Sequence, residues 1–204
     1  MLQKIQISCG YIIALPRLRP LARCVPENEE NVISLACQFV QAVLFMHDNS
    51  VAHLDLKPDN VLVDADLPQH LWIIDFGISV FVCDEDEEIK GYAGTPGWTA
   101  PEIGDENSPP QKYSPIRADR WSCGRMIQYF RTFGPGFKHP GLERLSLDLL
   151  NEDPVKRPSL ANQLLQIKKR PVTNPGEHVD QTFGKKRRLS HQEVGIIQGC
   201  HIIG

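Results

Sequence analysis

The 204-residue sequence predicts an α+β fold that is mainly helical. Apolar residues recur at spacings of three and four between about residues 31 and 47, which is typical of an amphipathic helix packed on a core. Two short apolar runs, Val61–Val63 and Leu71–Ile74, predict a β-hairpin. Further apolar segments after residue 117 predict more helices. These observations together favour a helical core with a small hairpin beside it.

The segments before the long helix are assigned from chain breakers and capping residues. Tyr11–Leu15 predicts a buried strand, which Pro16 stops. Residues 16–30 are rich in proline and charge and therefore predict a connector without regular structure. Asn28 and Asn31 are the two candidates for the helix N-cap, because asparagine side chains accept hydrogen bonds from free helical N–H groups.

The second half of the sequence predicts a long loop followed by helices. Residues 78–98 have no helical period and include the acidic run Asp84–Glu88, so we expect an exposed loop with solvated acids. A buried helix is predicted at about residues 118–131, and the leucines of residues 142–150 predict another. Ser159 is placed to cap a last helix, at about 159–169.

Charge and cysteine content exclude several classes of protein. A net charge of −3 gives no argument for binding nucleic acid or an anionic membrane. The six cysteines form no C-x-x-C pair, which indicates reduced thiols rather than zinc ligands or a disulfide framework. The longest early apolar run is too short to cross a membrane. We therefore expect an intracellular protein without membrane attachment.

Two basic clusters near the C-terminus bear on localisation. They are Lys168–Arg170 and Lys185–Arg188, in a region whose composition turns polar and basic. Such clusters serve as nuclear-import signals or as solubilising charge, so both cytoplasm and nucleus stay open. We expect residues 169–204 to form a disordered tail.

The chemistry-bearing residues concentrate in His53–Asn60, whose sequence is HLDLKPDN. Asp55 and Asn60 are five residues apart, so an extended loop lets both reach one reaction centre, and Lys57 between them can meet anionic oxygen. Any one of these residues is compatible with a polar surface loop. Asp75-Phe76-Gly77 and Ala100-Pro101-Glu102 follow in order, however, and a surface loop does not explain the set.

These three motifs resemble the catalytic loop, the metal-binding motif and the end of the activation segment of eukaryotic-type serine/threonine protein kinases. The resemblance covers about residues 10–168 and is strongest from 53 to 124. It implies a protein-kinase-like large lobe at residues 18–168, with a small β-hairpin and a truncated small lobe. Residues 1–17 would then be a remnant of the small lobe and the hinge.

The resemblance also implies catalytic roles. Asp55 would accept the proton of the substrate hydroxyl, and Lys57 would neutralise charge on the transferred phosphoryl group of ATP. Asn60 and Asp75 would hold Mg²⁺ against the ATP phosphates through hard oxygen ligands. Thr95, in the loop that faces the substrate, would contact Asp55 and Lys57.

Other residues of the motifs are expected to have structural roles. The resemblance implies that His53 is a buried support of the loop and that Gly77 frees the backbone after the metal ligand. It implies an ion pair between Glu102 and Arg157. Asp119 would accept backbone hydrogen bonds from the catalytic loop.

The sequence departs from the family pattern in two places that matter. Leu54 stands where the family has the arginine that pairs with a phosphorylated activation segment, so we expect no dependence on phosphorylation between Ile78 and Thr95. Before position 53 the only glycine is Gly10, so this sequence contains no Gly-rich phosphate loop, and no strand lysine of the family type is evident.

Several functions are therefore compatible with the sequence. The first is ATP-dependent phosphorylation of serine and threonine in protein substrates. Alternatives are a pseudokinase or interaction module without activity, and a kinase fragment whose small lobe is missing or supplied by a partner protein. A small-molecule phosphotransferase is disfavoured by Lys57-Pro58 and by the run from Thr95 to Glu102.

Overall fold

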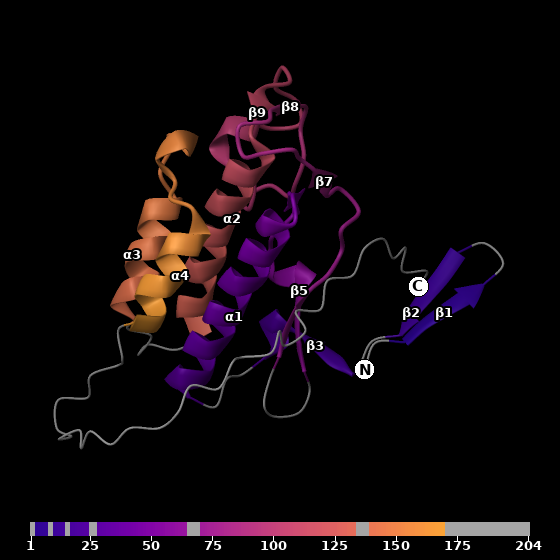
Figure 1. Cartoon of the computed structure of the whole chain (residues 1–204), viewed down its shortest axis with the longest axis vertical. Helices are drawn as coiled ribbons and strands as arrows, with labels where there is room; N and C mark the ends of the chain where they lie inside the picture. Colours follow the sequence, from indigo (N-terminus) through magenta and orange to yellow (C-terminus); the bar gives the residue numbers. More distant parts are fainter. Residues whose placement is uncertain are drawn as a thin grey trace.

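The computed structural model describes residues 3–7, 10–14, 17–24, 28–64, 70–133 and 139–169. Within these residues, helices form the main body and the strands form small antiparallel sheets (Figure 1). The predicted mainly helical α+β character is confirmed. The α-helices are α1 (Glu29–Asp48), α2 (Pro115–Phe130), α3 (Pro140–Leu149) and α4 (Leu160–Lys169).

The strands are short and pair only with antiparallel neighbours. They are β1 (Gln3–Ile7), β2 (Gly10–Ala14), β3 (Leu18–Pro20), β4 (Val51–Ala52), β5 (Val61–Asp64), β6 (Leu71–Ile73), β7 (Val80–Phe81), β8 (Ile89–Lys90) and β9 (Lys112–Tyr113). Single 3-10 turns lie between these strands and helices, at η1 (Leu21–Arg23), η2 (Pro58–Asn60), η3 (Pro101–Ile103), η4 (Arg131–Phe133) and η5 (Pro154–Lys156).

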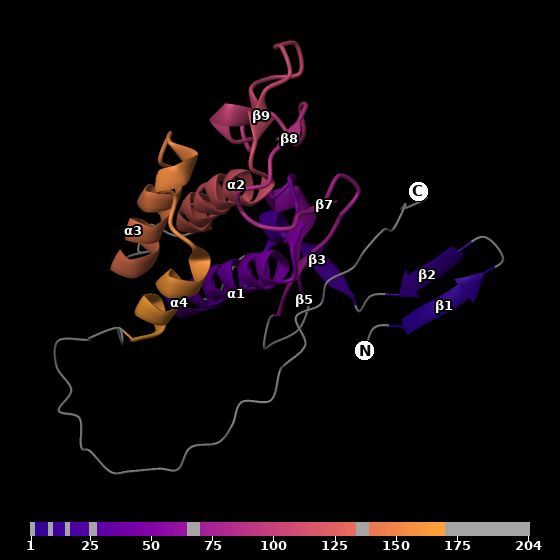
Figure 2. The same ribbon diagram turned by 45° about the horizontal axis from the view of Figure 1, so that its top comes forward.

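Helix α1 is the centre of the fold. Its N-cap is Asn28, whose side-chain oxygen accepts the N–H of Asn31 at 2.9 Å, so the first of the two predicted caps is correct. Its apolar stripe is buried and includes Phe39, which lies against Phe130 of α2 with ring centroids 6.0 Å apart. Figure 2 shows α1 between the small sheet of β3, β5 and β6 and the pair α3 and α4.

The predicted hairpin forms between β5 and β6, with Val61 opposite Ile73 and Val63 opposite Leu71. These four side chains point into the core, because alternate residues of a strand face the same side. Strand β3 extends the sheet by pairing with β5. The prediction of an irregular connector over residues 16–30 is wrong at this point, since a three-residue strand is too short to show a periodic pattern.

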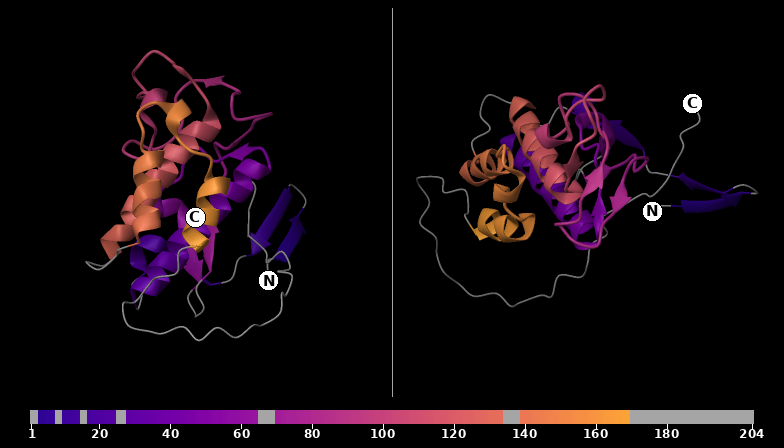
Figure 3. Two further views of the ribbon diagram at one scale, coloured as in Figure 1. Left: turned by 60° about the vertical axis from the view of Figure 1, so that its left-hand side comes forward. Right: turned by 90° about the horizontal axis from the view of Figure 1, so that it is seen from above.

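Tyr11–Leu15 was expected to form a strand, and β2 covers Gly10–Ala14. It pairs with β1 in a hairpin that stands away from the helices in every view (Figures 1 to 3). Leu15 and Pro16 lie outside the described residues.

The last helices pack around α2. Gly124 of α2 permits close contact with α3, because a methyl group there would lie 3.0 Å from the side chains of Leu149 and Leu150. Helix α2 begins at Pro115, three residues before the predicted start, with Ser114 as its N-cap. Helix α4 begins at Leu160, directly after Ser159.

Residues 78–98, predicted as a long exposed loop, pair with other strands at two places. Strand β7 pairs with β4 next to the His53–Asn60 stretch, and β8 pairs with β9 just before α2. Two-residue strands carry no sequence signal of their own. Most of Asp84–Glu88 is exposed, as predicted, but Glu85 and Asp86 also form ion pairs with arginines of α2.

No helix in the described part of the chain is long and apolar enough to cross a membrane. The expected disordered tail lies outside the described residues, apart from Lys169 at the end of α4.

The central position of α1 gives a stability prediction. Phe39→Ala removes a fully buried ring and should lower the free energy of unfolding by about 3–5 kcal/mol. Phe45→Ala, on the same helix but 42% exposed, is the matched control and should cost less than about 1 kcal/mol. Urea unfolding followed by circular dichroism measures both. Equal effects would contradict the assignment of the core face.

Candidate active site

The buried carboxylate of Asp119 in α2 binds the backbone of the candidate site. Its Oδ2 accepts the backbone N–H of His53 at 2.6 Å, and its Oδ1 accepts that of Leu54 at 2.8 Å. His47 at the end of α1 lies 3.3 Å from Oδ2 through Nε2. The two backbone hydrogen bonds expected for Asp119 are present in the structure. One residue thereby fixes the start of the loop that contains Asp55.

His53 is fully buried and supports the loop rather than facing the reaction centre. Its Nδ1 accepts the backbone N–H of Asp55 at 3.2 Å, so the ring proton belongs on Nε2. Nε2 then donates to the carbonyl oxygen of Ile74 at 3.0 Å. This bond connects the Asp55 loop to the residue just before Asp75.

Asp55, Lys57 and Thr95 form a closed triangle of hydrogen bonds. Lys57 Nζ donates to Asp55 Oδ2 at 2.8 Å and to Thr95 Oγ1 at 2.7 Å. The Thr95 hydroxyl in turn donates to Asp55 Oδ1 at 2.7 Å. The predicted contacts of Thr95 are therefore present. A hydroxyl thus donates to a carboxylate that can accept a proton and itself accepts a hydrogen bond from an ammonium group.

The orientation of the Asn60 amide is fixed by Asp55. Asn60 Nδ2 donates to the Asp55 backbone carbonyl at 2.8 Å and to Asp55 Oδ2 at 2.9 Å. Only the nitrogen of an amide can donate, so the assignment of nitrogen and oxygen is unambiguous. The amide oxygen is left as the atom that can bind a cation.

Asp75 follows β6 and lies in a left-handed backbone conformation, with φ of 64°. Aspartate tolerates this region better than most residues. Its Oδ1 accepts the N–H of Gly77 at 3.3 Å, and the side chain is exposed. A hydrogen bond from Ile74 N–H to the Asn60 carbonyl, 3.0 Å long, ties the two loops that carry Asn60 and Asp75.

The chemistry of these donors fits a divalent cation with phosphate ligands. An amide oxygen and an exposed carboxylate are hard oxygen ligands, which suit Mg²⁺ and leave positions for phosphate and water. The described residues contain no cluster of three or more His, Cys, Asp or Glu side chains that could form a metal cage by themselves.

The ionisation of Asp55 is set by opposing influences. Partial burial opposes the charged form, but the hydrogen bonds from Lys57 and Thr95, the positive charge of Lys57 and the Asn60 amide outweigh it. The pKa of Asp55 is therefore lowered from its ordinary value. A carboxylate that stays ionised can accept a hydrogen bond from an incoming hydroxyl.

Leu54 has a structural role that the sequence did not indicate. Its side chain is buried among Val82, Ile103, Tyr113 and Ile116, in a cluster that includes parts of the loop and of α2. Its φ of 66° is unusual for leucine. The hydrogen bond to Asp119 and the apolar surroundings hold it there. In the same cluster, burial of Tyr113 and the negative charges of Asp119 and Glu102 raise the pKa of Tyr113 to about 12.

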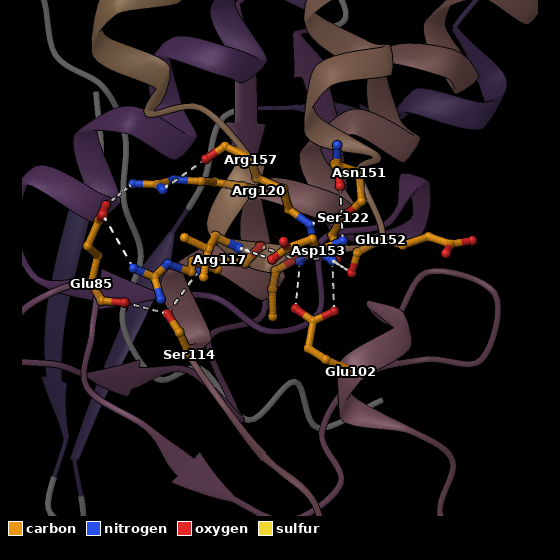
Figure 4. A network of polar contacts seen from close by, with 12 residues as sticks. Glu85, Glu102, Ser114, Arg117, Arg120, Ser122, Asn151, Glu152, Asp153 and Arg157 are labelled. Atoms are coloured by element: carbon orange, nitrogen blue, oxygen red, sulfur yellow. Dashed lines mark hydrogen bonds and ion pairs between the residues drawn. The ribbon is translucent and has the colours of Figure 1, made fainter.

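Two further contacts fix the loop that carries Thr95. Gly94 has φ of 110°, and a methyl group there would lie 2.9 Å from the Leu54 carbonyl oxygen, so only glycine fits. At the end of the loop, Glu102 receives two hydrogen bonds from Arg157, at 2.5 and 2.8 Å (Figure 4). The expected ion pair is therefore present, and its guanidinium is fully buried.

Sequence reasoning missed the Ile74 carbonyl, Gly94 as a contact of the Leu54 backbone, and Glu85. A backbone acceptor leaves no trace in a sequence. For Glu85 a signal existed, because Arg117 and Arg120 are one helical turn apart on α2 and can meet the same acid.

Comparison with known proteins places these features in a family. The family model described as "Protein kinase domain" matches residues 17–145, which is more than half of the chain. Among curated proteins, rabbit (Oryctolagus cuniculus) "Serine/threonine-protein kinase 17A" is 40% identical over 100 residues, covering 48% of this chain and 23% of that protein.

Two human (Homo sapiens) proteins are similar at lower identity. "Death-associated protein kinase 2" is 37% identical over 111 residues, covering 52% of this chain and 28% of that protein. "Phosphorylase b kinase gamma catalytic chain, liver/testis isoform" is 32% identical over 123 residues, covering 58% and 29% respectively. The matched part of the chain thus spans about a quarter of the length of these relatives.

The Asp55 environment gives a prediction on ionisation. Lys57→Met removes a hydrogen bond and a positive charge, so the pKa of Asp55 should rise relative to wild type. With a lowered native pKa, ionised Asp55 stabilises the fold above its unfolded pKa, and this contribution is lost as the pH falls through the native pKa. A carbon-detected NMR titration of the carboxyl group measures the change. Lys112→Met, an exposed control, should leave it unaltered, whereas an unchanged pKa in Lys57→Met would refute the triangle.

Proposed function

The chain belongs to the protein kinase family, and we propose that it transfers the terminal phosphate of ATP to serine and threonine hydroxyls of protein substrates. The observation that carries the proposal is the Asp55–Lys57–Thr95 triangle, in which a side-chain alcohol is already hydrogen-bonded between the carboxylate and the ammonium group. The similarity to serine/threonine kinases supports it.

Asp55 would act as the acceptor of the substrate proton. A carboxylate oxygen can accept two hydrogen bonds, and Thr95 is the one donor to Oδ1 among the described residues, so room for a second remains. Oδ2 is held by Lys57 and Asn60 and keeps the group oriented. Positioning of this kind is the main contribution of a protein to phosphoryl transfer.

Lys57 would stabilise the charge that develops on the transferred phosphoryl group. Its ammonium contacts two oxygens of the triangle and its side chain is 19% exposed, so it is fixed yet reachable. A pre-positioned cation at the place where negative charge grows is worth more than one in bulk water.

Mg²⁺ bound with ATP would neutralise the phosphate charge and orient the leaving group. Asn60 through its free amide oxygen and Asp75 through its exposed carboxylate are the residues that would hold it. The hydrogen bond between Ile74 and Asn60 keeps these two loops in a constant relation.

We also propose that a small lobe outside the described residues contributes to the ATP pocket. The 204 residues contain no Gly-rich phosphate loop before the catalytic loop, and the hairpin of β1 and β2 is the structure described there. A small lobe from another segment or a partner protein would then complete the ATP pocket. An intracellular site of action, cytoplasmic or nuclear, is proposed from the cysteine spacing, which includes no C-x-x-C pair, and from the basic clusters Lys168–Arg170 and Lys185–Arg188.

A pseudokinase or interaction module is the second candidate. It would apply if no Gly-rich phosphate loop covers the site, because a pocket without one desolvates ATP poorly. A catalytically incomplete kinase fragment has the same support. Both predict a folded protein in which the triangle is intact but transfer is absent.

Transfer assays with Asp55→Asn test the proposal. Wild type should phosphorylate a serine- or threonine-containing protein in the presence of Mg²⁺ and ATP, and the substitution should lower the rate at least about 100-fold, because the proton acceptor is lost. Asp148→Asn, on α3 and distant from the triangle in sequence, should retain the wild-type rate.

The other outcomes assign the alternatives. Wild-type ATP binding without transfer would replace the proposal with a pseudokinase. A folded wild type with neither binding nor transfer, restored by adding a separate small lobe, would identify a fragment. Transfer that survives Asp55→Asn would overturn the role of Asp55.

A further inference from the structure

Glu85, between β7 and β8, is bound to two arginines of α2. Its carboxylate pairs with Arg120 through Nη2, and its Oε1 lies 3.7 Å from Nη2 of Arg117 (Figure 4). The neighbouring Asp86 pairs with Arg117 as well. The acidic segment is thus attached to the helix that also carries Asp119.

The Arg120 guanidinium depends on Glu85 for its charge balance. Its side chain is only 7% exposed, and Glu85 is the one carboxylate paired with it among the described residues. Nη1 donates to the Arg157 carbonyl at 3.4 Å, while the buried Nε–H has no partner in the described part of the chain. Loss of the Glu85 charge would leave a largely buried cation uncompensated.

Backbone contacts hold the same residue in register. The Ser114 hydroxyl donates to the Glu85 carbonyl oxygen at 2.6 Å and accepts the Arg117 N–H at 3.2 Å. Just beyond, Ile89 pairs with Tyr113 and Lys90 with Lys112. These contacts restrict the backbone at Glu85, so that its side chain lies beside Arg120.

The contact reaches the other end of the loop through Arg157. Arg120 donates to the Arg157 carbonyl, and the Arg157 guanidinium holds Glu102. Both ends of the segment between Ile78 and Glu102 are consequently attached to one arginine cluster. Thr95 lies between the two attachments.

We propose that Glu85 is a positioning residue whose fixed carboxylate latches the loop onto Arg117 and Arg120 and thereby holds Thr95 and the substrate-facing loop for phosphoryl transfer. This inference rests on the proposed function. A carboxylate at α2 carries its negative charge without phosphorylation. Leu54, which stands in place of an arginine, offers no cation that could bind a phosphorylated residue of the loop. The loop is therefore ordered without modification.

The latch is sensitive to ionic strength. Glu85 and Arg120 line a cavity of about 260 Å³ that also includes His47, and the Glu85 side chain is 47% exposed. Salt ions can therefore compete with the pair. A merely apolar contact would not respond in this way.

Limited trypsin digestion of the 204-residue chain, with cleavage after Lys90 as the readout, tests the latch without requiring activity. Glu85→Gln should be cleaved about fivefold faster than wild type, the ratio expected for a surface-linked ion pair at the upper end of its range. Glu88→Gln is the matched control, because Glu88 is exposed and makes no hydrogen bond or ion pair within the described residues. Far-UV circular dichroism verifies that each variant is folded.

Kinetics give the second readout. Glu85→Gln should raise the KM for the protein substrate with kcat changed less than twofold, and 0.5 M salt should reduce the difference from wild type, whereas Glu88→Gln should match wild type throughout. Equal cleavage after Lys90 in Glu85→Gln and Glu88→Gln would overturn the latch. Faster cleavage with unchanged KM would overturn its positioning role. A wild type without transfer would refute the proposed function, while the digestion would still decide whether Glu85 latches the loop.

Discussion

The buried carboxylate of Asp119 is the interaction on which the rest of the site depends. It is fully buried and accepts the backbone N–H groups of both His53 and Leu54. Two such bonds force the chain through the left-handed conformation at Leu54, which leucine would not adopt unaided. The turn directs Asp55 away from the core while the side chain of Leu54 enters an apolar cluster. The position of Asp55 is thus set by backbone hydrogen bonds.

Helix α2 holds the second half of the site through charge. Arg120 pairs with Glu85, and Arg157 beside it pairs with Glu102, so the two ends of the loop around Thr95 are attached to one region. The Arg157–Glu102 pair is buried, so desolvation offsets much of its attraction, and the Glu85–Arg120 pair is half open to solvent, so water weakens it. They are specific, however, since a misplaced loop would leave a buried guanidinium without a carboxylate. The arginines therefore select one loop conformation more than they stabilise the fold.

The sequence predicted the local part of this arrangement and missed the long-range part. Asp55, Lys57 and Asn60 lie within six residues, so their proximity follows from chain connectivity. Helix α1 and the β5–β6 hairpin were predictable because their apolar periods are long or paired. The strands β3, β7 and β8 have two or three residues and no period, and the docking of Glu85 depends on residues more than 30 positions away. Packing, rather than propensity, decides such elements. The roles of Asn60 and Asp75 toward Mg²⁺ remain predictions.

Amide hydrogen exchange in Asp119→Asn tests most directly whether Asp119 holds the loop that begins at His53. The new side chain has one acceptor oxygen in place of two, so one of the N–H groups of His53 and Leu54 loses its partner. The account predicts that exchange at these two amides accelerates at least about tenfold more than at Phe39 in the core. Equal acceleration at all three amides would contradict it, because Asp119 would then stabilise the whole fold without specifically holding the catalytic loop.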